Sequence, residues 1–201
     1  MKLKLILPTA LAALAFAGCL VPSVNPLYTE KDLIFDPALV GTWGEAGNED
    51  RHIFARDGDN AYTWTSRDKE STNVFRAHLL KLGEHRFLDA VLTRTSDEWK
   101  GVGRTAVVVR PAHLFFKVEM EKPTLRVRAF STEWLDKALE ADPKAVAHER
   151  IHEPDVDEEK GRVMLTASTA DLQKFILKHV EESKAFIEGA AWRRIESNAA
   201  R

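Results

Sequence analysis

The residues whose types and spacing could support chemistry are His148, Glu149 and His152, which form the pattern H-E-x-x-H. On a helix, the two histidines would share one face one turn apart. They could then bind Zn²⁺ while the glutamate activates a water molecule. Pro143 and Pro154 stand close on either side and shorten any helix that holds both ligands. The pattern therefore favours a charged connector and leaves a zinc site as the alternative.

Other residues that could ligate a metal are scattered along the chain. A zinc site needs a third ligand, for which Glu181 and Glu182 are candidates only by elimination. His78, His85 and His113 lie in or beside predicted strands, and no spacing links them. We expect each of these histidines at the surface or the edge of the core. The sequence therefore predicts no metal, no other cofactor and no catalytic residue.

The single cysteine, Cys19, follows a basic start and an apolar run. That run is too short to span a bilayer, which needs ~20 residues, and it has the pattern of an exported leader. Ala17, Gly18 and Cys19 resemble the lipobox of bacterial lipoproteins, in which the cysteine takes a diacylglycerol thioether and becomes the acylated N-terminus. The resemblance implies that residues 1–18 are a signal peptide and that Cys19 is the lipid-attachment residue.

Two destinations in the cell envelope remain open. Ala15-Phe16-Ala17 also fits an A-x-A cleavage site, and cutting after Ala17 would release a soluble periplasmic protein. By resemblance to lipoprotein sorting in two-membrane bacteria, Leu20 after the cysteine favours the outer membrane. We expect a lipid-anchored protein on the periplasmic face of the outer membrane, with the soluble periplasmic form as the alternative.

Composition excludes some classes of partner. The formal net charge of the chain is −2, and its basic residues are scattered, which argues against binding to nucleic acid. The apolar fraction of 44% and the charged fraction of 30% are ordinary for a globular domain. We expect a lipidated N-terminus and tether over residues 19–38, followed by a single domain over residues 39–201.

Alternating apolar and polar residues predict short antiparallel strands as far as Ser131. For example, Phe116, Val118 and Met120 alternate with Lys117 and Glu119. After Ser131 the spacing becomes helical, and Ser168 begins a capping-box pattern. We predict an α+β fold, mainly antiparallel β, in which a barrel or sandwich of about eight strands is followed by C-terminal helices. Ala191 to Ile195 is expected to form a closing strand.

A second resemblance concerns the first strand of the domain. Gly41-Thr42-Trp43 resembles the G-x-W motif of lipocalins, in which the tryptophan plugs one barrel end beneath a late arginine. Arg193 or Arg194 would take the part of that arginine. The stretches 75–83 and 165–175 are similar to a group of uncharacterised bacterial lipoproteins, a likeness that implies fold and location but no activity. These resemblances imply a lipocalin-like barrel.

The aromatic residues of the strands are expected to fill the core, with a ligand pocket as the alternative. They are Trp43, Tyr62, Trp64, Phe115, Phe116 and Phe130. The sequence thus favours a membrane-anchored protein with a non-catalytic binding or envelope role, whose partner is a small apolar ligand or another envelope protein. The alternatives are a membrane-tethered zinc hydrolase and a purely structural envelope component.

Overall fold

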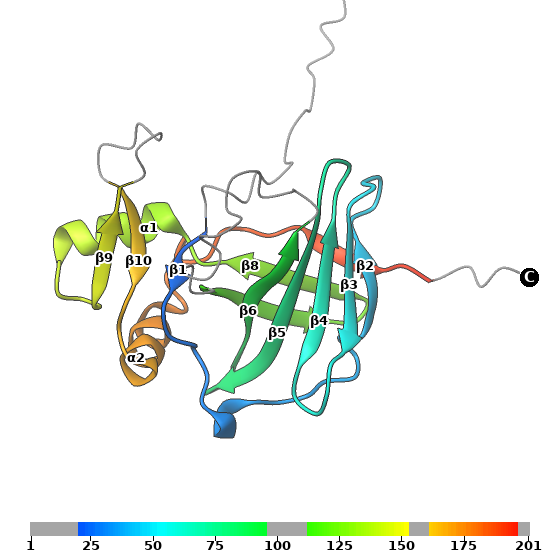
Figure 1. Ribbon diagram of the computed structural model, residues 1–201, viewed down its shortest axis with the longest axis horizontal. Helices are drawn as coiled ribbons and strands as arrows, with labels where there is room; N and C mark the ends of the chain where they lie inside the picture. Colours follow the sequence, from blue (N-terminus) through cyan, green and yellow to red (C-terminus); the bar gives the residue numbers. More distant parts are fainter. Residues whose placement is uncertain (1–19, 96–111, 153–160, 197–201) are drawn as a thin grey trace, which may run out of the picture.

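The computed structural model describes residues 20–95, 112–152 and 161–196, and most of the strands in these ranges form a closed antiparallel barrel (Figure 1). Pairing between β6 and β7 closes the ring, in which β11 lies between β2 and β8. The prediction of a mainly antiparallel, lipocalin-like fold is confirmed, as a barrel and not a sandwich. Among the described residues, its eight strands are β2 (Gly41–Gly44), β3 (Arg51–Arg56), β4 (Tyr62–Arg67), β5 (Thr72–Leu82), β6 (His85–Thr95), β7 (His113–Glu121), β8 (Thr124–Ala129) and β11 (Ala191–Arg194).

A smaller lateral unit packs against one wall of the barrel, at the left in Figure 1. It comprises the strands β1 (Pro22–Ser23), β9 (His148–Ile151) and β10 (Arg162–Leu165) and the helices α1 (Thr132–Ala141) and α2 (Thr169–His179). Ser131 and Ser168 cap the two helices by accepting the backbone N–H of Trp134 and Asp171. Within the described ranges, no helix has both the length and the apolar character needed to cross a membrane.

The lateral unit exists because one barrel wall is apolar on both faces. Consecutive apolar residues interrupt the alternation on three neighbouring strands: Leu79-Leu80 on β5, Phe87-Leu88 on β6 and Phe115-Phe116 on β7. In each pair one side chain joins the barrel core and the other joins a second core under the helices. The outer side chains need cover from water, and the lateral unit supplies it.

Strand β7 joins the barrel to the lateral unit. Along one edge it pairs with β6, and along the other it pairs with β8 from Phe116 onward. Its first residues, His113 and Leu114, pair instead with β1. The chain leaves the barrel after β8, since Phe130 packs in the second core, and β1 occupies the edge that β8 vacates.

The N-terminal segment is packed into the fold and does not form a free tether. Val21 is 4% exposed and Leu27 is fully buried, so the described part of the expected 19–38 tether belongs to the folded body. The backbone N–H of Leu27 donates to Asp89 Oδ2 at 2.7 Å, and η1 (Glu30–Asp32) follows. The segment lacks periodicity because its apolar residues serve two different cores: Val21 and Leu27 in one, Leu20 in the other.

One barrel end is closed by a tryptophan beneath an arginine, as the lipocalin resemblance implies. The Arg194 guanidinium lies over the Trp43 ring, 4.6 Å from its centroid. Arg194 also donates to the carbonyls of Val40 at 2.7 Å and Ala38 at 2.5 Å. Of the two candidate arginines, Arg194 therefore takes this position. Gly41 lets the guanidinium approach, since a Cβ there would collide with Arg194 Nη1.

Replacing Gly41 by alanine should destabilise the barrel by about 2–4 kcal/mol, from a positive φ and from displacement of Arg194. Gly58→Ala is the matched control. Gly58 also has a positive φ, 77° against 143° for Gly41, but a Cβ added there would have no other atom within 4 Å. We expect it to cost only about 1 kcal/mol. Urea unfolding of both variants measures the difference, and equal losses would contradict a packing role for Arg194.

Candidate functional site

The H-E-x-x-H residues do not lie on a helix. His148, Glu149 and the two residues after them form β9, which pairs with β10 from His148↔Leu165 to Ile151↔Arg162. At ~3.3 Å per residue, positions four apart on a strand are roughly 13 Å apart, too far to share one zinc ion. The helix that the zinc alternative requires does not form at residues 148–151, because these residues pair with β10.

The remaining metal-ligand candidates do not converge. Glu181 lies beside Lys117 and His85, with its Oε1 3.4 Å from Lys117 Nζ and 3.5 Å from His85 Nδ1. Glu182 Oε1 instead contacts His179 Nδ1 at 2.6 Å. Among the residues that the structure describes, no group of three His, Cys, Asp or Glu side chains is arranged to hold a metal ion.

His113 forms a close pair with a buried carboxylate on the outer wall of the barrel. Asp89 is 1% exposed, and its Oδ1 lies 2.6 Å from His113 Nδ1. Such a pair can orient an imidazole as a general base, and in a nucleophilic triad the other ring nitrogen is hydrogen-bonded to a hydroxyl or thiol. Within the described residues no hydroxyl or thiol forms that hydrogen bond. Since the other oxygen of Asp89 accepts from Leu27, we assign the pair to holding the N-terminal segment.

His78 lies on the same outer wall without joining that pair. Its Nδ1 is 3.1 Å from the carbonyl oxygen of Asn60, and its ring lies 4.7 Å from that of Tyr28. Burial lowers the pKa of His78 below its ordinary value. These contacts with a turn and a ring make His78 a packed wall residue, as the sequence suggests.

The barrel interior is packed with aromatic rings around Trp64. The Trp64 ring centroid lies 5.4 Å from that of Phe54, 5.0 Å from Phe75 and 5.3 Å from Phe116. Trp43 and Tyr62 belong to the same core, whereas Phe115 and Phe130 belong to the second one. All six predicted aromatics are thus buried, and the interpretation of them as core residues holds, although they divide between two cores.

His52 and Trp64 place polar atoms in this aromatic interior without hydrogen-bond partners. They are 8% and 3% exposed, and His52 Nδ1 and Trp64 Nε1 are buried and unsatisfied in the structure. The His52 ring stacks on Trp192 at 3.6 Å, and its centroid is 6.1 Å from that of Trp64. An unsatisfied buried polar group costs about 1–3 kcal/mol, so these atoms mark a site that a polar group would stabilise.

The chemistry of the pair defines what it can bind. An indole N–H only donates, and a neutral imidazole nitrogen can accept. Burial lowers the pKa of His52 from 6.5 to about 4, which keeps the ring neutral near pH 7. A hydroxyl group can accept from Trp64 and donate to His52, and the surrounding rings suit an apolar body. Sequence reasoning missed His52, although its spacing of two from Phe54 on β3 indicates an inward side chain.

Comparison with known proteins adds no assignment. No family model, no curated protein and no solved structure matches the chain. Cys19 and residues 1–18 lie outside the described residues. The candidate site therefore rests on the geometry around His52 and Trp64.

Acid should destabilise the protein through His52. Because the folded state holds the pKa of His52 below its unfolded value of 6.5, only the unfolded chain gains a proton as the pH falls from 6.5 toward 4. The contribution of His52 to the free energy of unfolding is therefore fully present above pH 6.5. About 2 kcal/mol of this contribution is lost between pH 7.5 and pH 5.

Urea unfolding of the wild type and of His52→Phe at both pH values tests this. Contributions from other titrating groups cancel in the comparison. Between pH 7.5 and pH 5, the free energy of unfolding of His52→Phe should fall by about 2 kcal/mol less than that of the wild type. An equal loss in both proteins would mean that the His52 ring is not held neutral by burial.

Proposed function

We propose that this protein is a lipid-anchored envelope protein whose barrel binds a small, mainly apolar ligand through one polar group, without catalysis. The observation that carries the proposal is the unsatisfied pair His52 Nδ1 and Trp64 Nε1 inside an aromatic barrel interior. Small-ligand sites combine apolar walls with a few polar groups that fix orientation. A ligand with one hydroxyl group on an apolar body matches both features.

The membrane is the source of ligand in this proposal. Acylation of Cys19 with two or more chains would anchor the protein stably. Val21 and Leu27 are buried, so no flexible spacer separates the described body from that residue. Leu20 packs against the barrel core itself. An acylated Cys19 would thus hold the barrel directly at the bilayer surface, on the periplasmic face of the outer membrane.

A zinc hydrolase receives no support from the geometry. Its proposed residues His148 and Glu149 lie on β9, with the glutamate and histidine side chains on alternating faces of the strand. A purely structural envelope component needs no unsatisfied polar atoms in its interior. The following experiment separates that alternative from a binding role.

Native mass spectrometry of the full chain, purified from cells in mild detergent, should show a retained small molecule. Trp64→Phe should reduce its occupancy, because the ligand then loses its hydrogen-bond donor. Trp134→Phe is the matched control, since Trp134 packs against the second core. A bare chain, or equal retention in both variants, would contradict interior binding and favour a structural role.

The anchor is tested separately by intact mass and detergent-phase partitioning. The mature protein should begin at Cys19 with the added mass of acyl groups and enter the detergent phase. Cys19→Ser should move it to the aqueous phase, because the apolar chains are lost. A mature chain that begins at Gly18 without acyl mass would rule out the anchor and leave a soluble periplasmic protein.

A further inference from the structure

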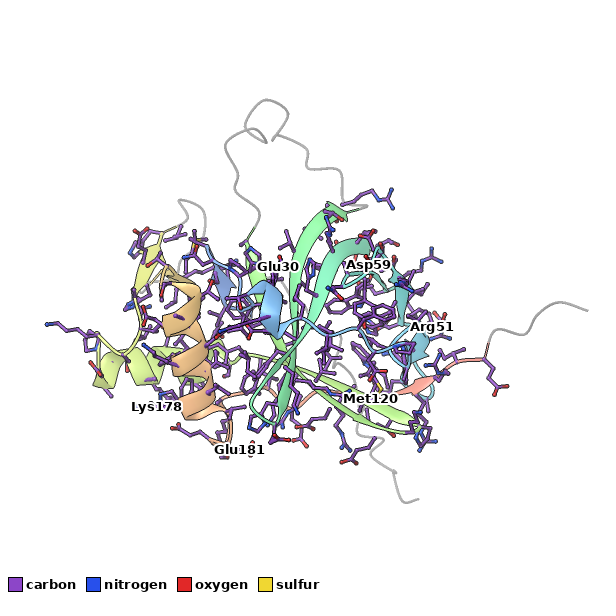
Figure 2. The ribbon with its side chains drawn as sticks, turned by 90° about the horizontal axis from the view of Figure 1, so that it is seen from below. Glu30, Arg51, Asp59, Met120, Lys178 and Glu181 are labelled. Carbon is purple, nitrogen blue, oxygen red and sulfur yellow. The ribbon has the colours of Figure 1, made fainter. Side chains whose placement is uncertain are left out.

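The barrel end closed by Trp43 and Arg194 carries a cavity that the interior site does not use. The cavity has a volume of about 230 Å³ and is lined by Ala38, Trp43, Met120, Lys122, Pro123 and Arg194. Four of these residues are apolar or aromatic, and two are cations. Met120, labelled in Figure 2, comes from the end of β7, and Lys122 lies in the turn between β7 and β8.

The two cations of this cavity have no carboxylate partner among the residues that the structure describes. Arg194 is held by the carbonyl oxygens of Val40 and Ala38, which accept its hydrogen bonds but carry no net charge. Among the described residues, neither Arg194 nor Lys122 forms an ion pair. The lysine beside the turn between β5 and β6 does have a carboxylate partner, since Lys81 Nζ lies 3.6 Å from Glu84 Oε2. An apolar cavity whose lining residues include two cations without ion pairs matches an anionic group on an apolar tail.

We infer that this cavity binds a small carboxylate with a short alkyl or aryl tail. The carboxylate would lie between Lys122 and the outer N–H groups of Arg194, and the tail would lie against Trp43, Met120 and Pro123. At ~30 Å³ for each water-sized group, the cavity holds roughly seven or eight such groups, which suits an eight-carbon acid. This site is separate from the interior pair at His52 and Trp64 and does not depend on the proposed function.

Octanoate is the probe, titrated into the full chain in mild detergent by calorimetry, with tryptophan fluorescence as a second readout. We expect octanoate to bind and its affinity to fall with added salt, because the contact is ionic and exposed. Octanol and octylammonium carry the same tail without the negative charge, and both should bind several-fold more weakly. Equal affinity for octanol and octanoate would overturn the inference.

Lys122→Gln should weaken octanoate binding roughly two- to fivefold, as expected for loss of one exposed ion pair, and Lys122→Arg should restore it. Lys178→Gln is the matched control: Lys178 is also exposed, but it lies on α2, on the other side of the view in Figure 2. The affinity of Lys178→Gln for octanoate should equal that of the wild type.

Trp64→Phe separates this site from the barrel interior. If Trp64→Phe weakens octanoate binding while Lys122→Gln does not, octanoate occupies the interior, and the end site is overturned while interior binding gains support. If only Lys122→Gln weakens it, the end site is supported whatever the interior binds. Equal octanoate affinity in wild type, Lys122→Gln and Trp64→Phe would also overturn the end site.

Discussion

Closure of the barrel is the constraint on which the rest of the structure depends. A closed ring leaves no unpaired strand edge, and here the ring is completed by the four-residue strand β11 between β2 and β8. So short a strand supplies few backbone hydrogen bonds. Its inward-facing side chains add packing: Trp192 enters the interior, and Arg194, two residues later on the same face, covers Trp43 at the barrel end. The last described strand, β11, thus pairs with the first barrel strand, β2, and this pairing encloses the barrel interior.

The second constraint is the apolar outer wall of β5, β6 and β7. Paired apolar residues such as Phe115-Phe116 put one side chain inside the barrel and one outside, so this wall must be covered. The helices α1 and α2 cover part of it, and the N-terminal segment covers more, held by the hydrogen bond from Leu27 to Asp89. The same burial that stabilises the wall removes the spacer that the sequence suggested between Cys19 and the domain.

These constraints locate two groups of polar side chains that the fold leaves available to a ligand. Inside the barrel, aromatic side chains packed around Trp64 exclude most polar groups. His52 Nδ1 and Trp64 Nε1 are therefore polar atoms in apolar surroundings. At the closed end, carbonyls accept the hydrogen bonds of Arg194 and fix its position, but none of the carboxylates that the structure describes forms an ion pair with it. The two places differ in chemistry, since one offers a neutral donor and acceptor and the other a pair of cations.

The sequence by itself determined the strand-rich fold, the late helices and the closing strand near Trp192, and its resemblance to lipocalins implied the tryptophan beneath an arginine. Period-two alternation and helix caps are local signals, so they can be read from neighbouring residues. Only the tertiary structure decided between Arg193 and Arg194, because which side chain reaches Trp43 depends on the register of β11 against β2. It also decided that His148 and His152 lie on and beside a strand, since pairing with β10 outweighs local spacing. His52 and Trp192 lie on strands that are far apart in the sequence, so the contact between their rings exists only once the barrel has closed.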